Sequence, residues 1–151
     1  MAMVMTGEVQ LPASREAVWA KLNDAETLKA CIPGCEELVK LSDTEMTAVA
    51  TTKIGPVKAR FKGKVYLTDL DPPNGYRISG EGDGGVAGFA KGGATVALAD
   101  KDGGTLLTYN VEAQIGGKLA QLGQRLVNGA AKKVADEFFQ KFATVFSAPA
   151  A

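Results

Sequence analysis

Apolar and polar residues alternate along much of the chain, and this alternation predicts β-strands. From residue 2 to residue 12 the apolar side chains occupy mainly odd positions and the polar ones mainly even positions. Residues 57–67 alternate most cleanly, with Val65 on one face and Lys62 and Lys64 on the other. A period of two places one face on a core and the other in solvent. Further strands are predicted at residues 37–41, 44–54, 76–81, 89–99 and 105–115.

Two short helices are predicted directly after the first strand. Ser14 is a suitable N-cap for a helix that carries Val18 and Leu22 on one face. Asp24 is a suitable cap for a second short helix, which Pro33-Gly34 ends. The chain therefore turns through two helices before the main run of strands begins.

A long amphipathic helix is predicted over residues 118–145. At 1.5 Å per residue it would be about 40 Å long, enough to cross a whole domain. Its apolar stripe, with spacings of three and four, consists of Leu119, Leu122, Leu126, Ala130, Val134, Phe138 and Phe142. The order of elements predicts an α+β fold of type β-α-α-β6-α, a curved antiparallel sheet of about seven strands wrapped around the C-terminal helix.

The length and charge of the chain limit what it can be. With 151 residues it is long enough for one domain, which we place at residues 1–146, and residues 147–151 read as the start of a flexible tail. The 17 basic and 17 acidic residues cancel, which argues against nucleic acid as a partner. No stretch approaches the roughly 20 apolar residues that span a bilayer, and no targeting signal is visible, so the sequence predicts a cytoplasmic protein.

The chain contains no histidine, and this removes several kinds of chemistry. Ser-His-Asp and Cys-His relays are impossible, as are zinc sites that use histidine. Cys31 and Cys35 lack the further ligands that a metal needs, and we interpret them as reduced thiols, with a redox role as the alternative. We therefore predict no catalytic residue, no metal and no cofactor.

The chain is rich in glycine, with 18 residues of this type, and several fall inside predicted strands. Glycine within a strand marks a bend, a bulge or a close approach of another group. Sheet curvature alone would explain the pattern. The alternative is that small inward residues such as Ala90, Gly92 and Ala94 leave space for a ligand beneath the helix.

Several short segments, taken in order, resemble one known family. The resemblance covers residues 3–146, and each segment is weak alone while the ordered set is specific. The segments are Val18-Trp19-Ala20-Lys21-Leu22-Asn23-Asp24, Cys31-Ile32-Pro33-Gly34-Cys35, Ile54-Gly55-Pro56-Val57-Lys58, Phe61-Lys62-Gly63, Gly80-Glu81-Gly82, Gly88-Phe89-Ala90-Lys91-Gly92, Gly104-Thr105 with Tyr109, and Gly116-Gly117-Lys118-Leu119-Ala120-Gln121-Leu122-Gly123. In this order they resemble the carbon monoxide dehydrogenase CoxG family, a branch of the START/Bet v 1-like (SRPBCC) superfamily.

The resemblance implies a helix-grip fold with an apolar cavity between the sheet and the long helix. It also implies a lipid- or quinone-like ligand and an accessory role in the maturation or membrane recruitment of a molybdenum-containing CO dehydrogenase or a related molybdenum hydroxylase. Family members often continue into a Pro/Ala-rich linker and a membrane segment. For this chain, that implies peripheral association with the inner face of the membrane through residues beyond Ala151.

Six residues are our candidates for contact with such a ligand. For each of them ordinary core packing is an equal alternative. They are Phe61, Phe89, Tyr109, Leu122, Leu126 and Phe138. Tyr109 is the most informative, because its hydroxyl falls in an otherwise apolar row and needs a partner, either on a ligand or on the backbone.

Three functions remain open from the sequence. The first, which we favour, is a noncatalytic carrier of an apolar ligand. The second is a cavity enzyme of the cyclase or dehydratase type, which an inward carboxyl group with a strongly raised pKa would favour. The third is an interaction protein without a ligand, which a filled core would favour.

Overall fold

The computed structural model of the chain describes residues 1–146, and the predicted tail at 147–151 lies outside the described residues. Seven strands, four α-helices and one 3₁₀ turn follow one another in the order that the sequence predicts, apart from small additions. The elements are β1 Ala2–Leu11, α1 Arg15–Leu22, α2 Ala25–Cys31, β2 Cys35–Ser42, β3 Glu45–Ile54, β4 Val57–Asp71, β5 Gly75–Asp83, η1 Gly85–Ala87, β6 Phe89–Lys101, β7 Gly104–Gly116, α3 Lys118–Gln121 and α4 Gln124–Phe146.

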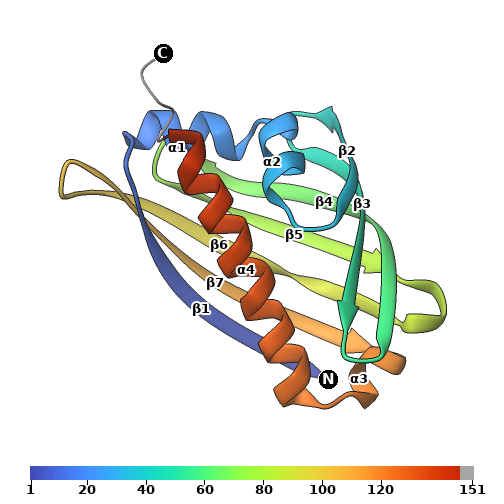
Figure 1. The fold of residues 1–151 in the computed structure, drawn as a ribbon. Coiled ribbons are helices and arrows are strands. Elements are labelled where there is room, and N and C mark those ends of the chain that lie inside the picture. The colour runs from blue at the N-terminus through green and yellow to red at the C-terminus, as the bar shows by residue number, and fades with distance from the viewer. Residues whose placement is uncertain (147–151) are drawn as a thin grey trace.

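All seven strands form one antiparallel sheet, as predicted. Their order is β1-β7-β6-β5-β4-β3-β2, so β1 and β2 are the edges and every neighbouring pair except β1 and β7 is also consecutive in the chain. The sheet curves behind α4, which crosses it diagonally, while α1 and α2 cover one end (Figure 1). This is the helix-grip arrangement that the alternation and the long apolar stripe predict.

The alternation in β4 is confirmed by its burial. Ala59 and Leu67 are buried on the inner face, while the basic row Lys58, Arg60, Lys62 and Lys64 is exposed on the outer face. Arg60 forms an ion pair of 2.9 Å with Glu36 on that outer face. The basic row therefore lies on the side of the sheet that faces away from α4.

The single long helix predicted over residues 118–145 is wrong at one point. The chain forms the short α3, breaks, and begins again as α4. The break is at Gly123, whose φ of +91° is a left-handed conformation that ends a right-handed helix. The restart rotates the faces of α4 relative to those of an unbroken helix.

Gly129 lies within α4, and nothing within 4 Å would meet a methyl group added there. Alanine at this position would lower the entropy of the unfolded chain and favour the helix. We expect Gly129→Ala to raise the free energy of unfolding by about 0.5–1 kcal/mol. Urea denaturation measures the change, and a loss of stability in the variant would contradict the helical environment described for Gly129.

The main core lies where α1, α2 and the C-terminal half of α4 meet the sheet. Leu11, Val18, Leu107 and Phe142 are fully buried there. Phe142 stacks on Phe138, with ring centroids 5.5 Å apart. A second cluster, which includes Met3, Ile115 and Leu119, closes the opposite end of the sheet. The two clusters lie at opposite ends of the strands, and the space between them contains the candidate site.

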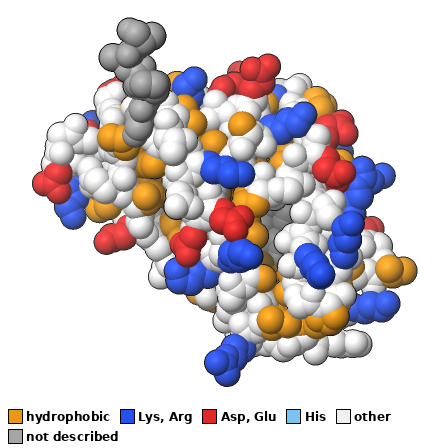
Figure 2. Space-filling view, in the orientation of Figure 1, with side chains coloured by type: hydrophobic (Ala, Val, Ile, Leu, Met, Phe, Trp, Pro, Cys, Tyr) orange, Lys and Arg blue, Asp and Glu red, His pale blue; other side chains and the backbone are white. Residues whose placement is uncertain are grey.

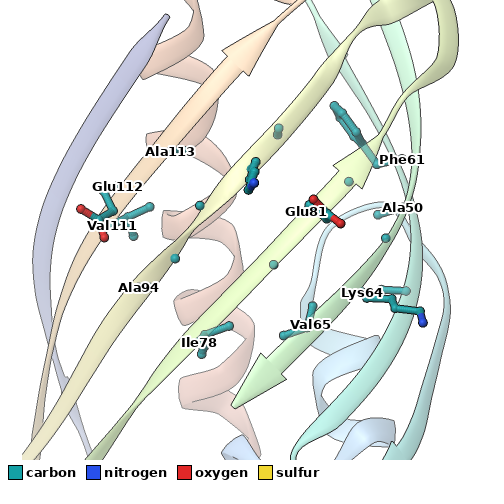
Figure 3. Close-up of a pocket in the computed structure, with 18 residues that line it drawn as sticks. Ala50, Phe61, Lys64, Val65, Ile78, Glu81, Ala94, Val111, Glu112 and Ala113 are labelled. Atoms are coloured by element: carbon teal, nitrogen blue, oxygen red, sulfur yellow. The ribbon is translucent and has the colours of Figure 1, made fainter. Parts of the chain in front are cut away.

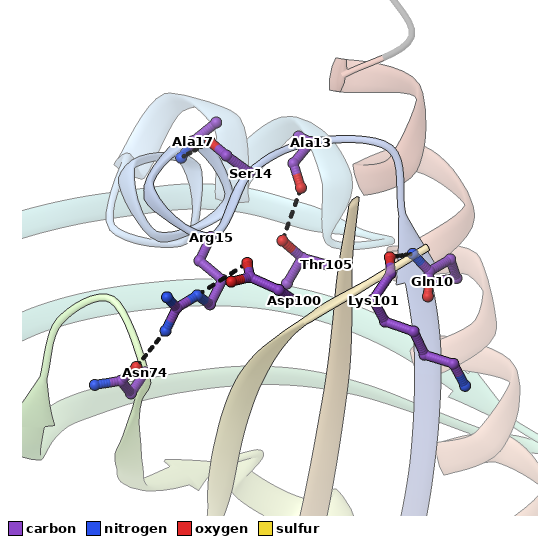
Figure 4. A network of polar contacts seen from close by, with 9 residues as sticks. All are labelled: Gln10, Ala13, Ser14, Arg15, Ala17, Asn74, Asp100, Lys101 and Thr105. Carbon is purple, nitrogen blue, oxygen red and sulfur yellow. Dashed lines mark hydrogen bonds and ion pairs between the residues drawn. The ribbon is translucent and has the colours of Figure 1, made fainter. Parts of the chain in front are cut away.

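Polar contacts fix the start of α1 to two hairpin turns (Figure 4). Arg15 forms an ion pair of 3.1 Å with Asp100 before the β6–β7 turn, and its guanidinium also donates to Asn74 in the β4–β5 turn. Thr105, which is fully buried, donates a hydrogen bond of 2.7 Å to the carbonyl oxygen of Ala13. These contacts hold α1 and α2 over the end of the sheet.

The Thr105 hydrogen bond gives a second stability prediction. Thr105→Val keeps the shape of the side chain but leaves the Ala13 carbonyl without this donor. We expect the free energy of unfolding to fall by about 1–3 kcal/mol. Thr68→Val, at an exposed position of β4, is the control and should change the unfolding free energy by no more than about 0.5 kcal/mol. Equal effects of the two substitutions in urea denaturation would contradict the anchoring role.

Candidate functional site

A cavity of about 530 Å³ lies between the inner face of the sheet, α2 and α4. Its volume is within the range of about 300–1,000 Å³ that is usual for sites that bind small molecules. Leu28, Ile32 and Pro33 close it at the α2 end, and Ile115 and Leu119 lie toward the α3 end. The core between α4 and the sheet is therefore not filled by side chains.

The lining of this cavity is almost entirely apolar. Of its 31 residues only Thr52, Tyr76 and Tyr109 carry a side-chain oxygen, and none carries a charge. Such a surface favours a molecule with a large apolar part and offers few places for hydrogen bonds. It also contains no pair of ionisable groups that could exchange a proton with a substrate.

The inner face of the sheet has a stretch without side chains. Gly80 lies opposite Gly92, and Gly63 lies opposite Gly82, on three adjacent strands. A second space of about 340 Å³ borders this stretch. Phe61, Val65, Ile78 and Val111 stand around it (Figure 3). All four also line the larger cavity, together with Ala48, Ala90 and Ala94, so the two spaces adjoin.

Both interpretations of these strand glycines hold at once. A methyl group on Gly92 would lie 2.0 Å from the carbonyl oxygen of Glu112, and one on Gly63 would lie 2.1 Å from that of Glu81. The close approach of the strands, and hence the curvature of the sheet, requires glycine at these two positions. The same absence of side chains enlarges the space beneath α4.

The face of the molecule that carries α4 is hollowed between this helix and strands β3 and β4 (Figure 2). Thr52 and Ile54 of β3 line the cavity here, opposite Ala131 and Val134 of α4. Leu126 closes the lower margin, because its Cδ2 would be 3.0 Å from a methyl group built on Gly55 in the β3–β4 turn. This hollow is the entrance to the cavity from solvent.

The structure brings three of the six candidate residues into the cavity lining. These are Phe61 of β4, Tyr109 of β7 and Phe138 of α4. Leu122 packs in the cluster near α3 and does not line the cavity. Leu126 is at the margin with 42% of its surface exposed. Contact of any of these residues with a ligand stays a prediction.

Phe89 lies on the opposite side of the sheet from the cavity. It is 48% exposed, and its ring lies over Gly116 of the neighbouring strand β7. The period of two along β6 places Ala90 and Ala94 inward and therefore places Phe89 outward. Leu122 and Leu126 are displaced for a different reason, since the break at Gly123 rotates α4 and brings Val127 to the inner face.

Sequence reasoning missed several lining residues. Phe139 stacks on Tyr109 with ring centroids 5.2 Å apart. Small residues of α4, namely Ala130, Ala131 and Ala135, leave room where a larger stripe was expected. Tyr76 was missed because its strand is short in the sequence pattern, although the inward row from Tyr76 through Ile78 to Gly80 could have placed it.

The two cavity tyrosines have different surroundings. Tyr109 is half-buried and its hydroxyl lies over Gly7 of β1. Tyr76 is only 5% exposed and packs edge-on against Trp19 of α1, with ring centroids 5.2 Å apart. No residue within 1–146 forms a hydrogen bond with either hydroxyl. Burial raises the pKa of Tyr76 well above its ordinary value of 10.0, so this phenol keeps its proton.

The raised pKa of Tyr76 predicts a pH effect on stability. The unfolded chain loses this proton first as the pH rises through 10.0, so the folded state then binds more protons and loses stability. The contribution is complete below pH 10.0 and lost above it. Relative to Tyr76→Phe, the wild-type unfolding free energy should fall by about 1.4 kcal/mol per pH unit in this range. Parallel pH profiles of the two proteins in urea denaturation would contradict this.

The resolved pKa changes elsewhere do not point to catalysis. A hydrogen bond from Thr51 lowers the pKa of Glu36, and one from Thr27 lowers the pKa of Asp24. Burial raises the pKa of both free thiols, Cys31 and Cys35, so neither is activated as a nucleophile. Within residues 1–146, no three Cys, Asp or Glu side chains gather as a metal site requires.

Comparison with known proteins places this geometry in a family. The model of the carbon monoxide dehydrogenase CoxG family matches residues 7–147. The chain belongs to the CoxG family. No curated protein matches the sequence. Within the described residues, no helix has both the length and the apolar character needed to cross a membrane.

Solved structures similar to this CoxG-family chain share its fold. A conserved protein from Geobacillus kaustophilus has 33% sequence identity and a TM-score of 0.89, with 96% of this chain and 95% of that chain covered. A START superfamily protein from Mycobacterium smegmatis has 12% identity and a TM-score of 0.72, with 95% and 97% covered. The di-domain ARO/CYC BexL from the BE-7585A biosynthetic pathway has 13% identity and a TM-score of 0.69, with 97% and 50% covered. The fold is therefore that of the START/Bet v 1-like proteins.

Proposed function

We propose that this CoxG-family chain is a noncatalytic carrier that holds a lipid- or quinone-like molecule in its cavity. In this role it serves a CO dehydrogenase or a related molybdenum hydroxylase during maturation or recruitment to the inner face of the membrane. The observation that carries the proposal is the cavity of about 530 Å³ whose 31 lining residues include no charged side chain. The family name supports the link to the enzyme.

An enzymatic role is the second candidate, because the fold is shared with an ARO/CYC protein. A cyclase or dehydratase needs groups that move protons at the substrate. The cavity offers only hydroxyl groups for this, and the two carboxyl groups with resolved changes, Asp24 and Glu36, have lowered rather than raised pKa values and lie outside the lining. This contrast favours the carrier.

A pure interaction protein is the third candidate. It would have a core filled by side chains, whereas this chain leaves an apolar space beneath a helix faced with alanine. An unfilled apolar core costs stability, since each lost contact removes packing energy. A bound ligand would restore those contacts, and this gives the cavity a purpose in the carrier that it lacks in the third candidate.

Ligand titration tests the carrier proposal directly. Isothermal titration calorimetry with a decyl-substituted benzoquinone and with palmitate should show binding at one site per chain, accompanied by a negative heat-capacity change from buried apolar surface. Binding should also raise the midpoint of thermal unfolding. Absence of binding for both ligands would contradict the proposal.

The link to a partner enzyme needs a separate test. The tagged chain, purified from cells that express a molybdenum hydroxylase, should retain that enzyme when the cavity ligand is present. Recovery of the chain without any part of the hydroxylase would contradict the accessory role and leave the ligand-binding role standing.

A further inference from the structure

Tyr76 places one hydrogen-bond donor at the inner end of an apolar cavity. It begins the inward row of β5, which continues through Ile78 to Gly80. Its ring is wedged against Trp19 of α1, with an interplanar angle of 80°. It also belongs to the main core cluster, so it stands where the packed core ends and the cavity begins.

The Tyr76 hydroxyl has no hydrogen-bond partner within residues 1–146. No side-chain oxygen in that part of the chain is both sealed from small molecules and unpaired. The hydroxyl is therefore reachable, and the space that Tyr76 lines is the cavity. A buried donor without a partner is unfavourable, so a group that accepts its hydrogen bond is favoured there.

Tyr109 serves as the internal comparison. Its hydroxyl lies over Gly7 of the edge strand β1, and its ring is stacked on Phe139. It is half-buried, close enough to the surface for water to satisfy it. Tyr76 is the tyrosine whose hydroxyl a ligand, rather than solvent, must satisfy.

We propose that Tyr76 orients the ligand by donating a hydrogen bond to a carbonyl oxygen, which enters first while the apolar remainder points toward the mouth between α4 and β3. The proposal rests on the carrier function and names the class of ligand, an apolar molecule with a terminal carbonyl acceptor. Tyr76 keeps its proton at neutral pH and so remains a donor. Thr52, at the mouth, is too close to solvent to play the same part.

A matched pair of probes separates this hydrogen bond from general apolar binding. 9-Fluorenone and fluorene share one tricyclic skeleton and differ in a carbonyl group against a methylene group. In equilibrium dialysis, Tyr76→Phe should weaken the binding of 9-fluorenone about 3- to 10-fold and leave that of fluorene unchanged or tighter. Tyr109→Phe, the control, should show no such selectivity.

The infrared carbonyl stretch of bound 9-fluorenone gives a second readout. In the wild type it should lie at the lower frequency of a hydrogen-bonded carbonyl, and in Tyr76→Phe at that of a free one. Phenylalanine keeps the ring against Trp19, and an unchanged circular dichroism spectrum confirms that the variant folds.

The outcomes separate the role of Tyr76 from the carrier function. Equal effects of Tyr76→Phe on both probes, or a free carbonyl in the wild type, would overturn the role of Tyr76 and leave the carrier intact. Selective loss in Tyr109→Phe instead would overturn it in favour of Tyr109. Failure of the wild type to bind either probe would overturn the carrier function, and the role of Tyr76 with it.

Discussion

Ala94→Phe should abolish most ligand binding while leaving the chain folded. Ala94 lines both the cavity and the glycine-bordered space beside it, and it lies on β6 between Ile78 and Val111 of the neighbouring strands. A phenyl ring at this position would occupy the centre of the space. We expect the affinity for a decyl-substituted benzoquinone to fall at least about 10-fold, which corresponds to about 1.4 kcal/mol.

The stability of Ala94→Phe separates an empty cavity from a filled core. Overpacking a filled core costs about 1–3 kcal/mol, whereas a real void accepts the ring with little loss. Ala97→Phe is the control, because Ala97 is exposed on the same strand and faces away from the cavity. It should leave the affinity unchanged. Unaltered binding in Ala94→Phe, or a collapse of its stability, would contradict the assignment of the cavity.

Phe142→Ala should produce the largest loss of stability of any single truncation considered for this chain. Phe142 is fully buried, stacks on Phe138 and meets Phe146 edge-on with centroids 5.2 Å apart. Removing a buried phenyl ring costs the transfer energy and leaves a hole, together about 3–5 kcal/mol. Urea denaturation measures this as a fall in the midpoint at constant slope.

Phe89→Ala is the matched control for this prediction. The same group is removed from a ring that is 48% exposed on the outer face of the sheet. We expect the loss to be about 1 kcal/mol, since only part of the apolar surface is taken from burial. A smaller loss for Phe142→Ala than for Phe89→Ala would contradict the described core.

Most of the sheet could be predicted from the sequence because its two faces meet different surroundings. In β4 the inner face meets the core and the outer face meets water, so alternation is strict from Val57 to Leu67. The hairpin between β6 and β7 was equally predictable, because Asp102 and Gly103 adopt the positive φ values of 50° and 78° that such a turn needs.

The break before α4 could not be predicted from periodicity. The apolar spacing runs through Gly123 without interruption, and a glycine within a helix costs only about 1 kcal/mol. What decides the break is the left-handed backbone at Gly123, which periodicity does not report. The misplacement of Leu122 and Leu126 follows from this one residue.

The candidate site was predictable in kind more than in its members. Small inward residues on β6 signalled space, and the cavity lies there. The depth of Tyr76 depends on the contact between β5 and α1, which are far apart in the sequence. A pattern read along one strand contains no information on such a contact.

The central claim is that the cavity holds an apolar molecule. Native mass spectrometry of the chain purified from its own host, followed by organic extraction, tests this most directly. We expect a stoichiometric bound species that extraction releases as a lipid or a quinone. A chain that carries nothing, and that also fails to bind quinones and fatty acids in titration, would contradict the claim.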